Sequence, residues 1–337
     1  MLGVLVLVHE LGHFLVARRA GVLCHEFSIG FGPKLYSWKP GETQFSLRAI
    51  PLGGYVLMAG EIPGESGKEL MAEPGRNLNE KSVWTRMSIA AAGSFTNFLL
   101  AIVLFFIIFS LLGIPTPTLV LDHVEPGLPA DQAGLEAGDR VIALNGEPVE
   151  SWMEVVFTVR DHLETPVIFT VERNNQIIEN EVVPQADPDQ GHPQVGIASQ
   201  VETIREPVLT ALWEAIKWTG EVLVLLVVTL TRMITGREGA DQLIGVVGMG
   251  AEVGRAAQMG LANVLALAGS ISASLGFINL LPIPALDGSR LVYLVIERIS
   301  GKPLDPEKEG LINLIGFVLL ILLAIYVTFQ DITRLTG

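Results

Sequence analysis

Long apolar runs without a charged residue alternate along this chain with segments rich in polar and turn-forming residues. Three of these runs, residues 87–112, 261–286 and 311–330, contain 20 or more residues each. A helix needs about 20 predominantly apolar residues to cross the hydrocarbon core of a bilayer. The pattern therefore predicts three transmembrane helices.

The first apolar stretch, residues 2–17, is shorter and is interrupted by His9, Glu10 and His13. A cleaved signal peptide would explain its length. However, the apolar core of a signal peptide does not normally hold a glutamate between histidines, and basic residues are missing before it. We therefore predict a fourth transmembrane helix here.

Residues 206–232 resemble a further span but follow another pattern. Polar residues recur at steps of three and four from Glu206 to Glu221, which gives the first half of the segment a polar stripe. Trp213 and Trp218 suit the level of the lipid headgroups. We expect an interfacial or re-entrant amphipathic helix in place of a span.

Composition and charge agree with a membrane protein. Of the 337 residues, 50% are hydrophobic and only 17% are charged, whereas a soluble domain carries about 25% charged residues. The net charge of −14 argues against a nucleic-acid partner. Basic residues gather in residues 18–86 and 289–310, and acidic ones in residues 112–206. The positive-inside rule places the basic segments in the cytoplasm and the acidic segment outside.

Two soluble segments show signals for strands and turns. Residues 30–33 and 51–55 are typical of turns on either side of the alternating stretch 43–48, which predicts a membrane-associated β-hairpin within residues 25–60. Residues 60–79 are polar and predict a loop. The single cysteine, Cys24, cannot form a disulfide within the chain and is expected to act as a small apolar side chain.

Residues 115–204 change to short β-branched runs separated by turn residues, which predicts a β-rich soluble module of ordinary domain size. Its short sequence motifs are Pro129-Ala130, Ala133-Gly134-Leu135, Gly138-Asp139-Arg140-Val141-Ile142 and Asn145-Gly146. These resemble a bacterial PDZ domain, a module that can add an extended peptide to a sheet edge. A β-rich module without any peptide ligand is the alternative, since a fold does not establish a function.

His9 and His13 are four residues apart, so on a helix both imidazoles lie on one face and can bind one zinc ion. Glu10 stands beside them as a general base for the attacking water. Two polar groups facing a neighbouring helix are the alternative interpretation. Ionisable groups inside a span are rare and are functional by default, so the motif predicts a zinc hydrolase.

A hydrolytic zinc site needs a third protein ligand. Asp287 stands out because it ends the uncharged run 261–286, and Pro282 and Pro284 must interrupt the helix before it. Irregular backbone at membrane depth persists only where it is buried in protein or lines a cavity. Asp287 is therefore the candidate third ligand, with an aspartate that caps the next helix as the alternative.

Two motifs stand on either side of the PDZ-like module: His9-Glu10-x-x-His13 and Asn279-x-x-Pro282-x-Pro284-x-Leu286-Asp287-Gly288. Together they resemble the site-2 protease family, in its bacterial branch that contains the regulator of sigma-E protease. Residues 30–33 and 51–55 also fit the family. Ser94 departs from it, because proline is common there, and is expected to alter a local bend. Several apolar residues usually precede the first motif, so we expect a truncated start.

The resemblance implies a polytopic α-helical membrane protein with about four transmembrane helices and an inserted extracytoplasmic PDZ domain. Residues 1–114 and 261–337 would form the two halves of the protease core, residues 115–204 the PDZ domain, and residues 205–260 the amphipathic helix and a connector. One zinc ion would be bound by His9, His13 and Asp287, with Glu10 as catalytic base. The candidate substrate-binding residues are Asn279, Pro282, Pro284, Gly53, Gly54 and Tyr55.

The implied activity is an intramembrane zinc endopeptidase in the bacterial cytoplasmic membrane. Its substrates would be single-span regulators such as anti-sigma factors, already cut once outside the membrane. The PDZ domain would then act as a size filter or bind the new peptide tail. Two alternatives remain: a membrane-anchored quality-control zinc peptidase, whose third ligand is a glutamate on a later helix, and a non-catalytic PDZ scaffold.

Overall fold

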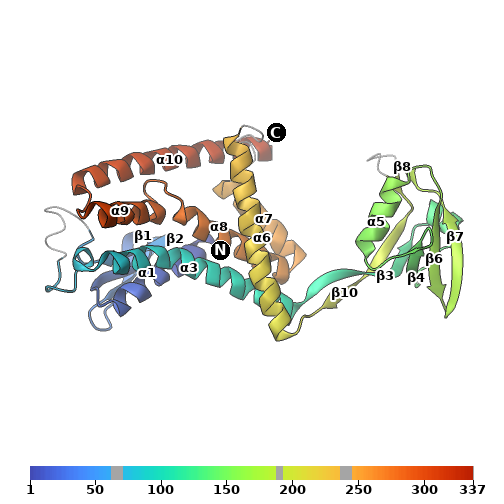
Figure 1. Ribbon diagram of the computed structural model, residues 1–337, viewed down its shortest axis with the longest axis horizontal. Coiled ribbons are helices and arrows are strands. Elements are labelled where there is room, and N and C mark those ends of the chain that lie inside the picture. The colour runs from blue at the N-terminus through green and yellow to red at the C-terminus, as the bar shows by residue number, and fades with distance from the viewer. Residues whose placement is uncertain (62–70, 187–192, 236–244, 337) are drawn as a thin grey trace. The chain divides into compact units, whose positions relative to one another are not determined.

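The computed structural model describes residues 1–61, 71–186, 193–235 and 245–336 (Figure 1). Parts of three predicted segments, the loop 60–79, the PDZ-like module and the connector before residue 260, lie outside the described residues. The chain divides into two compact units, Met1–Leu111 with Pro207–Gly337 and Leu112–Glu206. The second unit, close in its bounds to the predicted module 115–204, is an insertion between two halves of the first.

Helices build most of the first unit, and α3 lies at its centre, packed against α1, α6, α8 and α9. The turns η1 (Leu78–Glu80) and η2 (Ile108–Leu112) flank α3. The helices are α1 (Leu2–Arg19), α3 (Val83–Ile107), α6 (Val208–Ile234), α7 (Val246–Met259), α8 (Leu261–Leu280), α9 (Asp287–Ser300) and α10 (Pro306–Thr336).

Three helical segments among the described residues are long and apolar enough to cross a membrane: Val83–Leu112, Leu261–Leu280 and Glu307–Arg334. They match the three predicted apolar runs. The predicted fourth span, α1, does not meet that measure, because its 18 residues include the charged Glu10, Arg18 and Arg19. The count of four transmembrane helices therefore stays a prediction.

α6 is also outside these three segments. It is a helix of 27 residues that crosses the C-terminal part of α3 (Figure 1). Ala211, Ala215 and Thr219 form its buried face, and Trp218 packs against Phe105 and Phe109 of the α3 region. Most of its large apolar side chains are exposed, and its place at the membrane surface stays a prediction.

The hairpin region contains two long strands, β1 (Cys24–Trp38) and β2 (Gln44–Met58). Each strand bends, so that Phe27 pairs with Val56 on one side and with Phe45 on the other. The chain reverses its direction at both predicted turns, residues 30–33 and 51–55, because residues 44–47 and 54–57 pair with residues 26–29 in opposite directions. Both stretches nevertheless stay within continuous strands. Gly30 and Gly53 adopt φ values of +87° and +103° at these bends, a region that glycine enters without a steric penalty.

The helix α8, which occupies the predicted span 261–286, is shorter than the apolar run. α8 ends at Leu280, six residues before the run ends. Pro282 and Pro284 cannot continue a helix, and residues 281–286 form an irregular connection to α9. α10 contacts this connection, because Gly316 lies against Pro284 and the Asn313 side chain accepts a hydrogen bond from the Ala285 amide at 3.2 Å.

The second unit is a small β-structure with its own apolar core. Its main sheet has the order β10-β3-β4-β6-β7, with β5 paired to β4, and β8 and β9 form a separate pair. The elements are β3 (Ile114–Val124), α4 (Pro129–Gln132), β4 (Arg140–Leu144), β5 (Glu147–Pro148), α5 (Trp152–Asp161), β6 (Val167–Arg173), β7 (Gln176–Val182), β8 (Gln185–Ala186), β9 (Pro193–Gln194) and β10 (Ile197–Ile204).

A buried ion pair ties β4 to β6 in this unit. The Asp139 carboxylate is fully buried and accepts two hydrogen bonds from Arg173, at 2.6 and 2.7 Å, and one from the Glu136 amide at 2.9 Å. Burial alone would raise the pKa of Asp139, but these hydrogen bonds outweigh burial and lower the pKa below its ordinary value. The folded unit therefore favours the ionised form.

We expect Arg173→Met to destabilise this unit by about 3 kcal/mol, because it leaves a buried carboxylate without its cation. The pair's contribution should be complete above the unfolded pKa of about 3.9 and be lost as the pH falls through the lower folded pKa. Hydrogen exchange of the β4 and β6 amides in the full chain measures both effects. Arg140→Met, which changes an exposed arginine on β4, is the matched control. Equal exchange in the two variants would contradict the expectation.

Candidate metal centre

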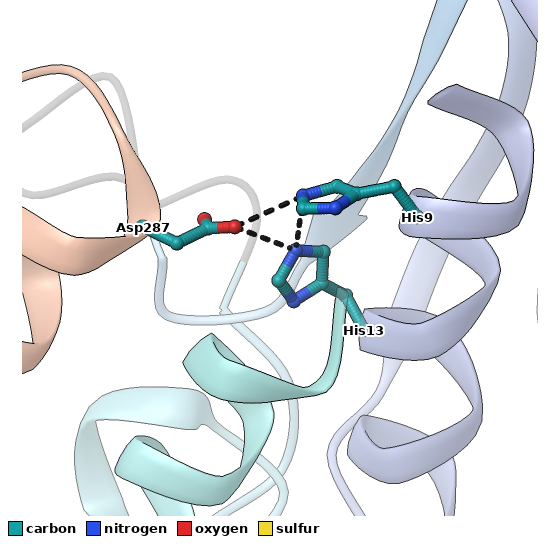
Figure 2. Close-up of side chains that lie close together, drawn as sticks. All are labelled: His9, His13 and Asp287. Carbon is teal, nitrogen blue, oxygen red and sulfur yellow. Dashed lines mark hydrogen bonds and ion pairs between the residues drawn. The ribbon is translucent and has the colours of Figure 1, made fainter. Parts of the chain in front are cut away.

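Two histidines on α1 face the same side of the helix, one turn apart, and lie toward Asp287 (Figure 2). The Nε2 atoms of His9 and His13 are 3.1 Å apart. Both residues are buried, with 6% and 7% of their surfaces exposed. Two imidazole nitrogens held this close are a typical donor pair for a transition-metal ion.

Asp287 completes the cluster from the far end of the chain. Its Oδ2 lies 2.9 Å from His9 Nε2 and 3.2 Å from His13 Nε2. Asp287 is the first residue of α9, but no side-chain hydrogen bond caps that helix. The carboxylate is directed at the histidines (Figure 2), which argues against the alternative interpretation of Asp287 as a helix cap.

The three side chains fit a zinc ion by their donor set and by the space around them. One ligand atom from each of His9, His13 and Asp287 lies within 4.8 Å of the other two, and two histidines with one carboxylate form a known set for catalytic zinc. Gly93 of α3 provides the space. A Cβ atom on Gly93 would lie 2.4 Å from His13 Nε2 and 2.6 Å from His9 Nε2.

Glu10 follows His9 on α1 and is directed toward the sheet. A Cβ atom on Gly54 would lie 3.9 Å from the Cγ atom of Glu10, so the Glu10 side chain lies beside β2. The carboxylate is thus positioned between the histidines of its own helix and a strand. This is the place where a general base would meet an extended peptide.

The strand beside Glu10 is an edge of the small sheet. Within the part of the chain that the structure describes, residues 54–58 of β2 pair only with β1, whereas residues 44–48 have a strand on each side. Residues 44–48 are therefore not an edge of this sheet. Gly53 and Gly54 are at the edge, and Tyr55 is fixed there by a hydrogen bond from Arg48 at 2.6 Å.

The other candidate substrate-binding residues lie at the end of α8 and in the connection before Asp287. Asn279 is in the last turn of α8, half-buried, with no hydrogen bond from its side chain among the described residues. Pro282 is exposed and Pro284 half-buried in the connection that delivers Asp287. These positions border the path from α8 to Asp287.

A cavity of about 750 Å³ adjoins Asp287. Charged side chains form part of its wall: Arg290 pairs with Glu61 at 2.7 Å, and Arg86 of α3 pairs with Glu297 of α9. A polar cavity of this size holds many water molecules. The metal cluster therefore lies beside a cavity that can hold water, within a mainly apolar unit.

Sequence reasoning missed several residues that shape the cluster. The Ile89 carbonyl accepts a hydrogen bond from His13 Nδ1 at 2.7 Å, and the Asn97 side chain lies 3.3 Å from His9 Nδ1. Gly93 makes room for both imidazoles. A signal for Asn97 was present, because it is one of few polar residues in the apolar run 87–112, but nothing in the sequence aligned it with His9.

Comparison with known proteins gives independent evidence on the family of this chain. Residues 1–323 match the model of peptidase family M50. The chain is 36% identical to the zinc metalloprotease RasP of Geobacillus kaustophilus, over 98% of this chain and 96% of that protein. It is 33% identical to the regulator of sigma-W protease RasP of Bacillus subtilis, over 99% of this chain and 96% of that protein.

Solved structures match the inserted unit. The PDZ domain of an SdrC-like protein from Listeria monocytogenes is 18% identical and covers 26% of this chain and 90% of that structure, with a TM-score of 0.23. The PDZ domain of an SdrC-like protein from Listeria innocua is 24% identical, with a TM-score of 0.22, and covers 26% of this chain and 94% of that structure.

Proposed function

Because this chain belongs to peptidase family M50, the site-2 proteases, we propose that it is an intramembrane endopeptidase that cuts the transmembrane segment of single-span membrane proteins. The family and the named relatives confirm the predicted zinc metalloprotease and its zinc cofactor. The observation that carries the finer proposal is the meeting of His9, His13 and Asp287, from opposite ends of the chain, inside a bundle of apolar helices.

In this proposal His9, His13 and Asp287 hold the zinc ion. When bound there, zinc lowers the pKa of water and polarises the scissile carbonyl. Glu10 accepts the proton of the attacking water and returns it to the leaving amine. The cavity next to Asp287 supplies the water, and its charged walls explain how water reaches the site.

The edge formed by residues 54–58 holds the substrate. A helical transmembrane segment hides its carbonyl groups in internal hydrogen bonds, so it must unwind before hydrolysis. An extended segment can pair with a free strand edge. Among the described residues, 54–58 have a partner strand on one side only, and Gly54 lies beside Glu10. Asn279, Pro282 and Pro284 bound the unwound segment from the other side.

The substrates proposed are single-span regulators such as anti-sigma factors, cut first outside the membrane. A relative bears the name regulator of sigma-W protease, which supports this class. The PDZ-like unit has a hollow of about 460 Å³ between α5 and β9–β10, bordered by Trp152, Arg160 and His123. A newly made peptide tail fits such a hollow, and a size filter is the other proposed role.

The proposed setting is the bacterial cytoplasmic membrane, with α1, α3, α8 and α10 as four crossings and the PDZ-like unit outside. Apolar helices and the family support a membrane protein. The basic segment that contains Arg86 and the loop after Asp287 then lie on the cytoplasmic side, in agreement with the positive-inside rule.

We expect Glu10→Gln to lower cleavage by about 10²- to 10⁴-fold, the usual contribution of a general base, while zinc stays bound. In-cell cleavage of a panel of truncated single-span substrates, together with metal analysis of the purified protein, measures both quantities. Glu252→Gln, at an exposed carboxylate on α7, is the control. Retention of normal cleavage in Glu10→Gln would refute the proposed mechanism.

A further inference from the structure

Asn97 lies in the middle of α3, fully buried where α1 and α8 pack against that helix. Its backbone carbonyl accepts a hydrogen bond from the Ser272 hydroxyl of α8 at 2.9 Å. Its side chain lies on the α1 side, with Nδ2 3.3 Å from His9 Nδ1. The amide group is thus the polar neighbour of the first histidine of the metal cluster.

The Oδ1 atom of Asn97 is buried and has no hydrogen-bond partner among the described residues. A buried acceptor without a partner costs about 1–3 kcal/mol. Such a group therefore needs an explanation. Asparagine has nearly the same shape when its amide is rotated by 180°, and this rotation exchanges Oδ1 with Nδ2.

Zinc binding by the cluster requires that rotation of the Asn97 side-chain amide. His9 presents Nε2 to His13 and Asp287, so in a metal-binding imidazole the proton stays on Nδ1, and Nδ1 becomes a donor. In His13 the corresponding proton goes to the Ile89 carbonyl. For His9 the near neighbour of Nδ1 is Asn97, and only its carbonyl oxygen can accept a proton.

We propose that Asn97 is a positioning residue whose side-chain carbonyl accepts the Nδ1 proton of His9 and so fixes the tautomer that offers Nε2 to zinc. This inference rests on the proposed role of His9 as a zinc ligand. It explains why an amide is buried in the apolar helix α3. It also gives the Nδ1 proton of each histidine an acceptor, which is the Ile89 carbonyl for His13 and Asn97 for His9. Outer-shell partners of this kind set ring orientation and tautomer in metal sites.

The test is zinc affinity of the full-length protein in detergent, measured by competition with a chelator. Asn97→Leu removes the acceptor at similar volume and is expected to weaken zinc binding about 10- to 100-fold. Asn97→Asp keeps an acceptor for the Nδ1 proton and is expected to stay within about threefold of the wild type. Ser94→Ala, which removes a buried hydroxyl without a partner on the same helix, is expected to change nothing.

Replacement of zinc by cobalt gives a measurement that a change in packing alone does not alter. The visible absorption bands of bound Co²⁺ report ligand geometry, so they should shift in Asn97→Leu and remain in Asn97→Asp. Thermal unfolding of each variant without metal checks the fold. Should Asn97→Leu unfold at a lower temperature, Asn97→Ala replaces it, because alanine removes the acceptor without adding bulk.

Wild-type zinc affinity in the folded acceptor-free variant would overturn the inference. So would equal losses in Asn97→Asp and Asn97→Leu when both fold normally, because the acceptor would then not be what matters. A wild-type protein without stoichiometric zinc would overturn the proposed function and this inference together. The first two results leave the proposed function intact, so the two failures are distinguishable.

Discussion

Replacing Asp287 by alanine is expected to remove stoichiometric zinc and all detectable cleavage together. The carboxylate lies within 3.2 Å of both histidine Nε2 atoms, and a catalytic zinc site needs three protein ligands. Loss of a direct ligand should cost more than the 10- to 100-fold in affinity that loss of an outer-shell partner costs, by the usual order of magnitude. His9 and His13 alone would hold the ion too weakly to survive purification.

Metal analysis and the in-cell cleavage assay measure this outcome. The rival enzyme class, a membrane-anchored quality-control peptidase with a glutamate as third ligand, predicts that Asp287→Ala keeps its zinc. Full zinc occupancy in that variant would therefore favour the rival. Asp305→Ala, at an exposed carboxylate just before α10, is a control that should retain both zinc and cleavage.

Replacing Gly93 by alanine is the second change with a large expected effect. The added methyl group would lie 2.4 Å from His13 Nε2 and 2.6 Å from His9 Nε2, distances that Cβ atoms essentially never show. The methyl group cannot move away, because Gly93 lies within the continuous helix α3. The imidazoles must therefore rotate out of the metal position, and we expect zinc and cleavage to fall below detection.

Gly250→Ala is the matched control, because Gly250 is also within a helix but has open space around its Cβ position. There the substitution is expected to stabilise the protein slightly, by about 0.5–1 kcal/mol. Zinc stoichiometry and melting temperature distinguish the two cases. Normal zinc content in Gly93→Ala would show that the ion is not held where the two Nε2 atoms meet.

Local patterns determined much of this protein. The spacing of His9 and His13 places both on one helix face whatever that helix packs against. The prolines at 282 and 284 end α8 before Asp287, since proline removes a helical donor. The β-branched run 140–144 forms the strand β4, because turn residues limit it on both sides.

Other features depended on packing. Residues 51–55 carry turn residues and reverse the direction of β2, yet they keep strand pairing with β1. The same pairing decided which stretch is an edge: residues 44–48 are enclosed and residues 54–58 are open on one side. No periodicity in the sequence distinguishes an inner strand from an outer one when both alternate.

Sequence patterns therefore established the metal-binding motif, the apolar runs, the inserted module and the family resemblance. The motif and the runs depend on near neighbours in the chain, whereas the family resemblance rests on two motifs on either side of the module. Only the tertiary structure decided which groups surround the motif. Asp287 and His9 are 278 residues apart in sequence, and Asn97 and His9 are 88 apart. Their meeting depends on how α1, α3 and α9 pack, and packing is a property of side-chain shape across the whole unit, which no local pattern contains.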